Sequence, residues 1–570
     1  MKKVLVYLVL LTAAAALSCT GSGSQPAAGS GKPTLSPQGL TGDDLAFSKF
    51  TKPVDVHIGH AVNPLDTTLP KGDTAGSNQY TRYYLDKHNI NIIVDWTAAS
   101  GEDYNQKVSL CIASDTLPDA LTAPNYNYVL KAAKAGQLYD ITDLYQQYAS
   151  NQVRGILDTF QGKAVEAASY EGRMIALPNA SVMDDGVTIM CIQKNWLDQY
   201  KLPVPKTLDD IENTARVFKK NAPAGTATVP IAGPDKNGKP YRNFLESLGN
   251  DKTFDPVFNA YDVYPGYFQD NGNGTVSYGS LNPNMKSALE RLARWYKDGL
   301  IDPEVGARDR TGELVNANQA GIFFGPWWAI GYGNGDSFKN NPNANWQAYP
   351  VYSNNGKWNV SQKAPSTAAL IISRRASPDT AAAVIITYNA EGPMEGMIDK
   401  SVSDAWIPLR TVLAPADELE VTYKALHKIL RKEAEPSDYN DRSSPYKLLW
   451  KDVQIVTPII PGYQPNRDLD IKDFDQNVNF GDFQRMFSIM VGTRPISEHK
   501  PDKEVFSVNY VLTDMLEQRW PNLFKMEQEV IMKIITGQLP VSAFDKFVSD
   551  WMAQGGQGVL DSVAKEFLKK

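Results

Sequence analysis

The chain has 570 residues, 42% of them hydrophobic, which is enough for two to four domains or lobes with sizeable cores. Its formal net charge of −7 lacks the basic excess of nucleic-acid-binding proteins, so we expect no nucleic-acid partner. Aromatic residues make up 10% of the chain, which suits large cores or sites that stack on flat ligands such as sugar rings.

The N-terminal segment has the pattern of an export signal. Lys2 and Lys3 precede an apolar run over residues 4–17, which ends just before Cys19. Because this run is too short to span a bilayer comfortably, we predict a signal peptide over residues 1–18, with an uncleaved anchor as the alternative. The residues after Cys19 are rich in Gly, Ser and Ala and predict a flexible tether, which we extend over residues 19–50.

The next part of the chain alternates between strand and helix patterns. Residues 54–62 and 89–98 predict strands, because β-branched residues alternate with polar ones. Residues 78–89 and 103–114 predict helices, and residues 117–125 contain a third, short strand. This β-α-β-α-β order predicts an α/β lobe with a largely parallel sheet, whose ligands lie beyond the carboxyl ends of the strands.

The rest of the chain continues this α/β pattern. Residues 172–197 hold two strand-like runs around a polar loop. Thr207 and Asp210 form a capping-box-like helix start, and Gly299 ends a predicted helix within residues 282–304. Further elements are a strand over residues 346–352, a strand-plus-helix unit over residues 366–390, and a mostly helical stretch over the last 60 residues.

Cys111 and Cys191 are the only cysteines after Cys19. They lie 80 positions apart and match no metal or redox spacing. We expect two buried thiols, with a disulfide between lobes as the alternative.

Catalytic motifs are absent from the sequence, so we predict that the protein is not an enzyme. No H-E-x-x-H, G-x-S-x-G, G-x-x-x-x-G-K-[ST] or C-x-x-C occurs, and no two of the five histidines have ligand spacing. Asp184 and Asp185 resemble a glycosidase pair, but neighbours in a strand point to opposite faces. A carbohydrate-active enzyme (a hydrolase or lyase) is the alternative class, because two distant acids can still meet in a cleft.

Two polar loops are candidate calcium sites. Residues 235–246 have Asp, Asn and Glu at ligand spacing, but Lys239 and Pro240 replace a ligand and the required Gly. Residues 269–274 have Gly272 in a ligand position, and both loops favour hairpin turns. We therefore predict no metal and no cofactor, with Ca²⁺ as the alternative.

Four stretches in order carry a resemblance to a known family, namely residues 112–124, 172–211, 296–304 and 535–556. With the N-terminal pattern, the chain resembles the extracellular solute-binding proteins of bacterial ABC importers, family 1, in their long lipoprotein branch. The resemblance implies that Cys19 is lipidated, although Ala16 stands where the lipobox usually has Leu.

The resemblance also implies the architecture. The fold class is α/β and periplasmic-binding-protein-like, with two α/β lobes around a ligand cleft, a hinge and added C-terminal helices. The crossings between lobes are expected near residues 177–185 and 349–365. The first lobe would comprise residues 51–183 and 351–430, and the second residues 184–350 and 431–570.

One aromatic stretch carries the main ligand-site prediction. The sequence GPWWAIGY, residues 325–332, is similar to a GPWAW segment of maltodextrin-type binding proteins, whose first tryptophan stacks on a sugar ring. Trp327 occupies the matching position, whereas Trp328 departs from the pattern. For both, packing into the core is the alternative to ligand contact.

Further candidate ligand-binding residues come from strand ends and from loops near the expected crossings. They are Asn179, Asp184, Asn125, Tyr126, Trp96, His60, Asn63, Trp406 and Arg410, and core or turn positions are the alternative for each.

The implied function is capture of a carbohydrate, specifically an oligosaccharide, by hinge closure. The protein would be an exported monomer that is anchored through a lipid on Cys19, faces the periplasm or cell exterior, and delivers its ligand to ABC permease subunits. A peptide or another polar solute is the alternative ligand.

Overall fold

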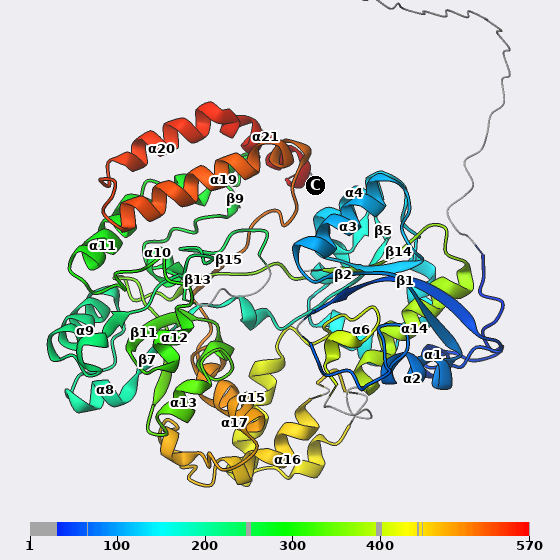
Figure 1. Cartoon of the computed structure of the whole chain (residues 1–570), viewed down its shortest axis with the longest axis horizontal. Coiled ribbons are helices and arrows are strands. Elements are labelled where there is room, and N and C mark those ends of the chain that lie inside the picture. Colours follow the sequence, from blue (N-terminus) through cyan, green and yellow to red (C-terminus); the bar gives the residue numbers. More distant parts are fainter. Residues whose placement is uncertain are drawn as a thin grey trace, which may run out of the picture.

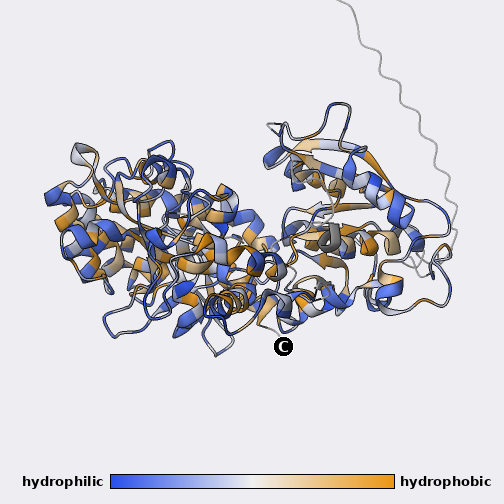
Figure 2. Ribbon diagram, turned by 90° about the horizontal axis from the view of Figure 1, so that it is seen from below, coloured by the Kyte–Doolittle hydropathy of each residue, from blue (hydrophilic) through white to orange (hydrophobic). Residues whose placement is uncertain are grey.

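The computed structural model describes residues 31–64, 66–246, 252–366, 368–394, 402–441, 444–446 and 448–568. Within these ranges the chain forms two α/β lobes (Figure 1). Figure 2 shows that the lobes meet at a narrow waist. The predicted signal peptide and Cys19 lie outside the described residues. Among the helices of the described ranges, none is long and apolar enough to cross a membrane.

Lobe 1 is built on a five-stranded sheet of order β2-β1-β3-β14-β6. Strands β1, β2 and β3 are parallel, as predicted, and β14 runs antiparallel to β3 and β6. Its elements are α1 (Gly42–Ala46), β1 (Val54–Val62), α2 (Gln79–His88), β2 (Ile90–Ala99), α3 (Glu102–Ala113), β3 (Ala120–Ala123), α4 (Tyr126–Lys134), α5 (Thr142–Tyr148), α6 (Asn151–Asp158), α7 (Lys163–Ala167), β4 (Ser169–Tyr170), β5 (Arg173–Met174), β6 (Ala176–Pro178), β14 (Ala369–Ile372), α14 (Pro378–Met394) and the 3-10 helix η5 (Asp404–Trp406).

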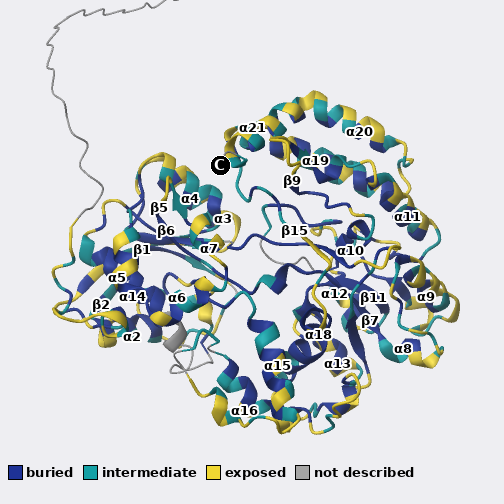
Figure 3. Ribbon diagram, turned by 180° about the vertical axis from the view of Figure 1, so that it is seen from behind, coloured by how far each residue is buried: buried dark blue, intermediate teal, exposed yellow. Residues whose placement is uncertain are grey.

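Both faces of the lobe 1 sheet are covered by helices. Apolar residues of α2, α5, α6 and α14 form one core cluster with the sheet, and those of α3 and α4 form another on the opposite face. In Figure 3 the centre of the sheet is buried, and the exposed residues lie mainly on the outer helices and loops. The continuously apolar β14 (ALII) follows from this double cover, whereas β1 and β2 alternate apolar and polar residues.

Lobe 2 is built on a four-stranded sheet of order β12-β7-β11-β8. Its main elements are η1 (Met183–Gly186), β7 (Ile189–Gln193), α8 (Lys194–Gln199), α9 (Leu208–Asn221), η2 (Gly225–Ala227), β8 (Val229–Ile231), α10 (Asp255–Asn259), β9 (Phe268–Asp270), β10 (Val276–Tyr278), η3 (Gly279–Leu281), α11 (Met285–Lys297), α12 (Gly312–Asn316), β11 (Ala320–Gly325), η4 (Trp327–Ile330), α13 (Asp336–Asn340), β12 (Trp346–Tyr349) and β13 (Asn359–Ser361). After the last crossing follow α15 (Glu418–Leu430), η6 (Pro436–Tyr439), α16 (Leu449–Ile459), η7 (Ile471–Asp473), α17 (Phe480–Phe487), η8 (Ser488–Gly492), α18 (Arg494–Glu498), β15 (Lys503–Val505), α19 (Asp514–Ile535), α20 (Ala543–Trp551), η9 (Met552–Gly556) and α21 (Gln557–Phe567).

The lobe 2 strands divide their side chains between two cores. Along β7, Ile189 and Cys191 face the cluster formed with α15 to α17, whereas Met190 and Ile192 face the cluster formed with α9, α11 and α19. Successive side chains of a strand point to opposite faces, so each strand serves both cores. Cys111 and Cys191 are buried in different lobes and do not pair with each other, in agreement with the predicted buried thiols.

The predicted tether over residues 19–50 is wrong for its described part, residues 31–50. Ala46 and Phe50 are buried in the lobe 1 core, and the backbone N–H of Thr34 donates to Asp379 at 2.8 Å. The prediction extended the Gly- and Ser-rich composition past the point where apolar side chains reappear and can be buried.

The predicted lobe boundaries at residues 351 and 430 differ from the structure. Trp358 and Val360 lie in a lobe 2 core, and β13 pairs with β15, so the chain returns to lobe 1 only at about residue 362. Helix α15 also packs in lobe 2, against α16 and α18. The second visit to lobe 1 therefore ends near residue 413, so the third crossing comes earlier in the chain than the predicted boundary at residue 430.

The C-terminal helices are attached to lobe 2 through a buried carboxyl group. Glu527 of α19 is 0% exposed and accepts hydrogen bonds from Tyr241 at 2.7 Å, Tyr278 at 2.9 Å and Ser280 at 2.7 Å. Burial raises the pKa of Glu527 to about 7, because the three hydroxyl donors only partly replace the lost hydration. Tyr241 precedes β9, Tyr278 ends β10 and Ser280 lies in η3, so the Glu527 carboxyl group links α19 to the lobe 2 body.

We expect the stability of lobe 2 to fall as the pH rises from about 5 to 8. The folded pKa of Glu527 lies above its unfolded pKa, so the folded state binds the proton more tightly between the two values. The stabilising contribution is complete below the unfolded pKa and is lost above about pH 7, a change on the order of 2 to 4 kcal/mol.

Thermal unfolding of wild type and Glu527→Gln across this pH range measures the effect. As the pH rises, the wild-type midpoint should fall relative to that of Glu527→Gln, because Gln cannot ionise. Glu529→Gln, on the exposed side of the same helix, is the matched control. A constant gap between wild type and Glu527→Gln would contradict the assignment.

Candidate functional site

Three segments join the lobes, at about residues 179–188, 362–368 and 411–417. The backbone N–H of Asn179 donates to Ala368 at 3.0 Å, which ties the first crossing to the second. Ala180 exchanges backbone hydrogen bonds with Val412 and Ala414 at 2.9 and 2.8 Å, which ties the first crossing to the third. The crossings thus form a single hydrogen-bonded strap between the lobes.

Buried polar groups lie where the strap enters lobe 2. Asp185 accepts a hydrogen bond from the indole N–H of Trp327 at 2.8 Å, and its carboxyl is buried, which raises its pKa. Lys363 is buried and donates to the backbone carbonyl of Ser181 at 3.1 Å, while burial lowers its pKa to about 8. Asp185 favours the charged form of Lys363. These groups hold the first two crossings together.

Trp327 therefore has a structural contact as well as its predicted role. Its side chain is only 7% exposed and packs in a lobe 2 core, whereas Trp328 is half-buried beside the same core. Ligand contact for both residues stays a prediction. Asp184 is buried next to Asp185 in η1, a 3-10 helix rather than the strand assumed from sequence, and burial raises its pKa to about 7.

An inter-lobe cavity of about 510 Å³ lies on one side of the strap. Lobe 1 lines it with Tyr126 and Tyr170, and lobe 2 lines it with Phe506, Tyr510 and Phe567. Polar side chains at its wall include Lys163, Glu166, Asn509 and Glu566. Aromatic rings from two bodies with a few polar groups between them are suited to a flat ligand with hydroxyl groups.

The cavity is closed along one edge by ion pairs between lobes. Lys131 of α4 lies 2.9 Å from Glu517, and Lys134 lies 3.2 Å from Asp514, both on α19. The amide oxygen of Asn127 accepts from the backbone N–H of Leu512 at 2.5 Å. Figure 1 shows the end of α21 beside α3 and α4 in agreement with these contacts. We call this set the α4–α19 contact.

Tyr126 links the inter-lobe cavity to the strap. Its hydroxyl donates to Ser366 at 2.9 Å, and Ser366 in turn donates to the carbonyl of Asn179 at 2.5 Å. The Asn179 side chain accepts from the backbone N–H of Val412. Two predicted residues from distant parts of the sequence are thereby brought into one hydrogen-bonded chain. Asn125, another predicted residue, caps α4, because its side-chain oxygen accepts from the backbone N–H of Asn127 at 3.0 Å.

Other predicted residues gather around a second pocket, within lobe 1. This lobe 1 pocket measures about 790 Å³, and its lining includes Asn63, Asp66, Thr97 and Trp406. The His60 and Trp406 ring centroids are 6.4 Å apart, and burial lowers the pKa of His60 to about 4, so its ring is neutral at physiological pH. The ends of β1 and β2 supply Asn63 and Thr97, as expected for strand-end sites.

Trp96 and Arg410 lie apart from the other predicted residues. The Trp96 ring lies across Gly59, where a Cβ atom would stand 2.2 Å from it, and its centroid is 5.6 Å from that of Tyr104 on α3. Arg410 is exposed and 3.5 Å from Asp404. The structure thus divides the predicted set among the strap, the inter-lobe cavity, the lobe 1 pocket and these two positions.

Sequence reasoning missed the lobe 2 wall of the inter-lobe cavity. Phe506, Val508 and Tyr510 alternate with polar residues in a segment between β15 and α19, for which the sequence analysis made no prediction. That alternation was the available signal.

The calcium alternative finds no support in the described residues. In the first loop Asp235 accepts from the backbone N–H of Asn237 at 3.0 Å, and Lys239 pairs with Glu246, so these groups have other partners. Over the described part of the chain, no cluster of three or more His, Cys, Asp or Glu side chains could hold a metal ion.

No protein-family model matches the chain. Among curated proteins it is similar to the fructooligosaccharide ABC transporter substrate-binding protein FusA of Streptococcus pneumoniae, with 26% identity over 244 residues. It is also similar to the polygalacturonan/rhamnogalacturonan-binding protein YtcQ of Bacillus subtilis, with 23% identity over 228 residues. The matches cover 40% and 37% of this chain and 43% of each relative, so the chain spans less than half the length of the curated relatives it matches.

Solved structures share the fold over nearly the whole chain. The alginate-binding protein AlgQ2 has a TM-score of 0.57 and 14% identity, covering 92% of this chain and all of that protein. FusA in complex with kestose has a TM-score of 0.55 and 16% identity, covering 90% and 99%. These structures show that the fold is the predicted periplasmic-binding-protein-like one. The predicted resemblance to ABC-transporter substrate-binding proteins agrees with the curated relatives.

We expect Trp327→Phe to destabilise the folded protein by about 1 to 3 kcal/mol. The substitution keeps an aromatic ring but leaves the buried Asp185 carboxyl without its indole donor. Chemical unfolding followed by circular dichroism measures the loss. Trp328→Phe is the matched control, because no hydrogen bond of its indole N–H is found among the described residues. Equal effects of the two substitutions would contradict the role given to the Asp185 contact.

Proposed function

We propose that this protein is the extracytoplasmic substrate-binding lipoprotein of an ABC importer, and that it captures a carbohydrate between its lobes by hinge closure. The observation that carries the proposal is the inter-lobe cavity, whose aromatic rings come from both lobes. A ligand held between Tyr170 and Tyr510 touches both lobes at once, so its binding favours the closed state.

Carbohydrate is the ligand class that the cavity favours. Sugar rings present apolar C–H faces to aromatic planes and hydroxyl groups to polar side chains. Lys163 on the lobe 1 side, with its ammonium 4.7 Å from the Phe506 ring centroid, and Asn509 on the lobe 2 side supply hydrogen-bond donors to the cavity. The names of FusA and YtcQ, which refer to oligosaccharides and polysaccharides, support an oligosaccharide over a peptide.

Binding rather than catalysis is the mechanism that we propose. FusA and YtcQ are described as binding proteins, and the chain carries none of the catalytic motifs sought in its sequence. The raised pKa values of Asp184 and Asp185 have a structural cause in their burial beside the strap. Closure then creates the surface that permease subunits recognise, and the ATPase is a separate chain.

Isothermal titration of residues 31–570 with fructooligosaccharides, polygalacturonate fragments and short peptides tests the ligand class. We expect binding to one glycan class, with Tyr510→Ala and Tyr170→Ala each weakening the affinity at least tenfold, which corresponds to about 1.4 kcal/mol. Tyr439→Ala, a half-buried tyrosine of η6 outside the cavity, should bind like wild type.

Chromatography of the glycan after incubation separates binding from hydrolysis. Recovery of intact glycan supports a carrier. Cleavage products would overturn the carrier interpretation and support a carbohydrate-active enzyme. Binding of peptides alone would overturn the carbohydrate assignment but would not affect the fold.

Lipid attachment at Cys19 is a separate prediction from the sequence. Cells that express the full chain should incorporate labelled fatty acid into it and retain it in the membrane fraction. Cys19→Ser should abolish the label and release the protein in soluble form. Membrane retention of Cys19→Ser would favour the uncleaved anchor instead.

A further inference from the structure

A third cavity, of about 550 Å³, lies wholly within lobe 2, and we call it the lobe 2 cavity. It is formed by the start of α9, the residues after α10, the middle of α11, the loop between β12 and β13, and the start of β15. It shares no lining residue with the inter-lobe cavity. Most of its wall consists of side chains that form hydrogen bonds, including Asp262, Arg291, Asn355, Lys357, Asn359 and Lys503.

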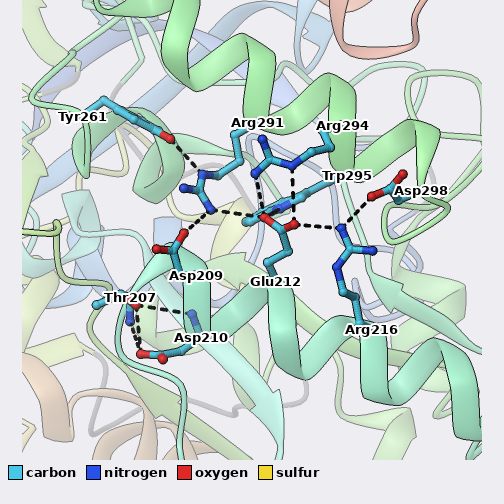
Figure 4. A network of polar contacts seen from close by, with 10 residues as sticks. All are labelled: Thr207, Asp209, Asp210, Glu212, Arg216, Tyr261, Arg291, Arg294, Trp295 and Asp298. Carbon is cyan, nitrogen blue, oxygen red and sulfur yellow. Dashed lines mark hydrogen bonds and ion pairs between the residues drawn. The ribbon is translucent and has the colours of Figure 1, made fainter.

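Arg291 is held in one orientation at this wall. Its Nε donates to the Tyr261 hydroxyl at 2.8 Å, and its Nη1 lies 2.7 Å from Asp209 and 3.2 Å from Glu212. Figure 4 shows these contacts, together with the arginines that share Glu212. The Arg291 side chain is only 10% exposed. A guanidinium fixed by contacts on two of its nitrogens is preorganised and loses little entropy when it binds a ligand.

Most charged side chains of the lobe 2 cavity already have a partner. Lys503 lies 2.7 Å from Asp262, and Lys357 also lowers the pKa of that carboxyl. Asp502 accepts from the backbone N–H of Trp358 at 2.8 Å. Because Lys503 and both carboxylates already have partners, an anionic ligand at Lys503 would have to displace an existing pair. Lys357 forms no ion pair among the described residues and is open to a hydroxyl oxygen. Hydroxyl groups, which donate and accept, fit such a wall without displacing one.

One buried acceptor at this wall is unsatisfied. Asn359 is 8% exposed, and its amide oxygen has no hydrogen-bond partner within the described residues. Its amide nitrogen makes only a long bond, 3.4 Å, to the carbonyl of Asn259. A buried acceptor without a donor costs about 1 to 3 kcal/mol. Because this oxygen has almost no accessible surface, the Asn359 amide has to turn toward the cavity before a ligand hydroxyl can relieve that cost.

We propose that the lobe 2 cavity is a second binding site for a neutral saccharide unit, separate from the inter-lobe cavity. Asn359 accepts a hydroxyl hydrogen, Arg291 and Lys357 donate to hydroxyl oxygens, and the sugar covers the neighbouring Leu208 and Ala260 with its apolar face. The site is contained in one lobe, so occupancy does not require closure. It stands whether or not the inter-lobe cavity binds the transported ligand.

Saturation-transfer NMR on residues 31–570 tests this site with methyl glucoside, methyl galactoside and methyl fructoside as neutral probes and galacturonate as the anionic probe. We expect a neutral glycoside to bind in Tyr510→Ala as it does in wild type. Asn359→Leu and Lys357→Ala should each raise the apparent Kd of the glycoside at least threefold. Lys533→Ala is the matched control, because Lys533 is exposed on α19 and lies outside both cavities.

The outcomes separate the two cavities. Loss of the signal in Tyr510→Ala, with no effect of Asn359→Leu or Lys357→Ala, would assign all binding to the inter-lobe cavity and overturn the second site. Binding of galacturonate alone would also overturn it, because the site would then select an anion. Absence of any signal has the same meaning. Lys357 is exposed, so Lys357→Ala remains informative even if Asn359→Leu fails to fold.

Discussion

The threefold crossing of the chain is the constraint on which the rest of the structure depends. Neither lobe is continuous in sequence, so the lobes can separate only by bending the hydrogen-bonded strap. At Gly186 a Cβ atom would lie 2.7 Å from the backbone nitrogen of Lys363, so a side chain there would push the first and second crossings apart. The Asp185–Trp327 bond anchors the first crossing to lobe 2. The first crossing is therefore held in place at its lobe 2 end.

The contacts between the lobes differ in strength in a way that suits a reversible hinge. Lys131 and Lys134 are exposed to a considerable extent, and ion pairs of this kind contribute about 0 to 1 kcal/mol each and weaken with salt. The attachment of α19 to lobe 2 is of the opposite kind, with Glu527 buried among three hydroxyl groups. The C-terminal helices therefore move with lobe 2, and their contact with α4 is the part that can open.

Local patterns predicted the elements well and their grouping less well. The strand predicted over residues 54–62 is β1, and the capping box at Thr207 and Asp210 is present as expected. These features depend on neighbouring residues. The third crossing depends on where α15 packs, and that is decided by apolar contacts with α16 and α18 that its own sequence does not specify. The lobe 2 wall of the inter-lobe cavity escaped prediction for the same reason, because residues 506–511 gain their role from lying opposite α4 and α7.

The aromatic surface open to a ligand comes from other residues than the tryptophan pair in GPWW. The Trp327 ring is packed in lobe 2, and its N–H is committed to Asp185, so in this state it offers little area for stacking. Tyr170, Phe506 and Tyr510 line the inter-lobe cavity instead, and each belongs to a segment next to the strap or to the α4–α19 contact. A change in the angle between the lobes alters the spacing of these rings directly. In the proposed carrier, the rings that contact the ligand therefore also respond to closure, which couples occupancy to the hinge without any intervening element.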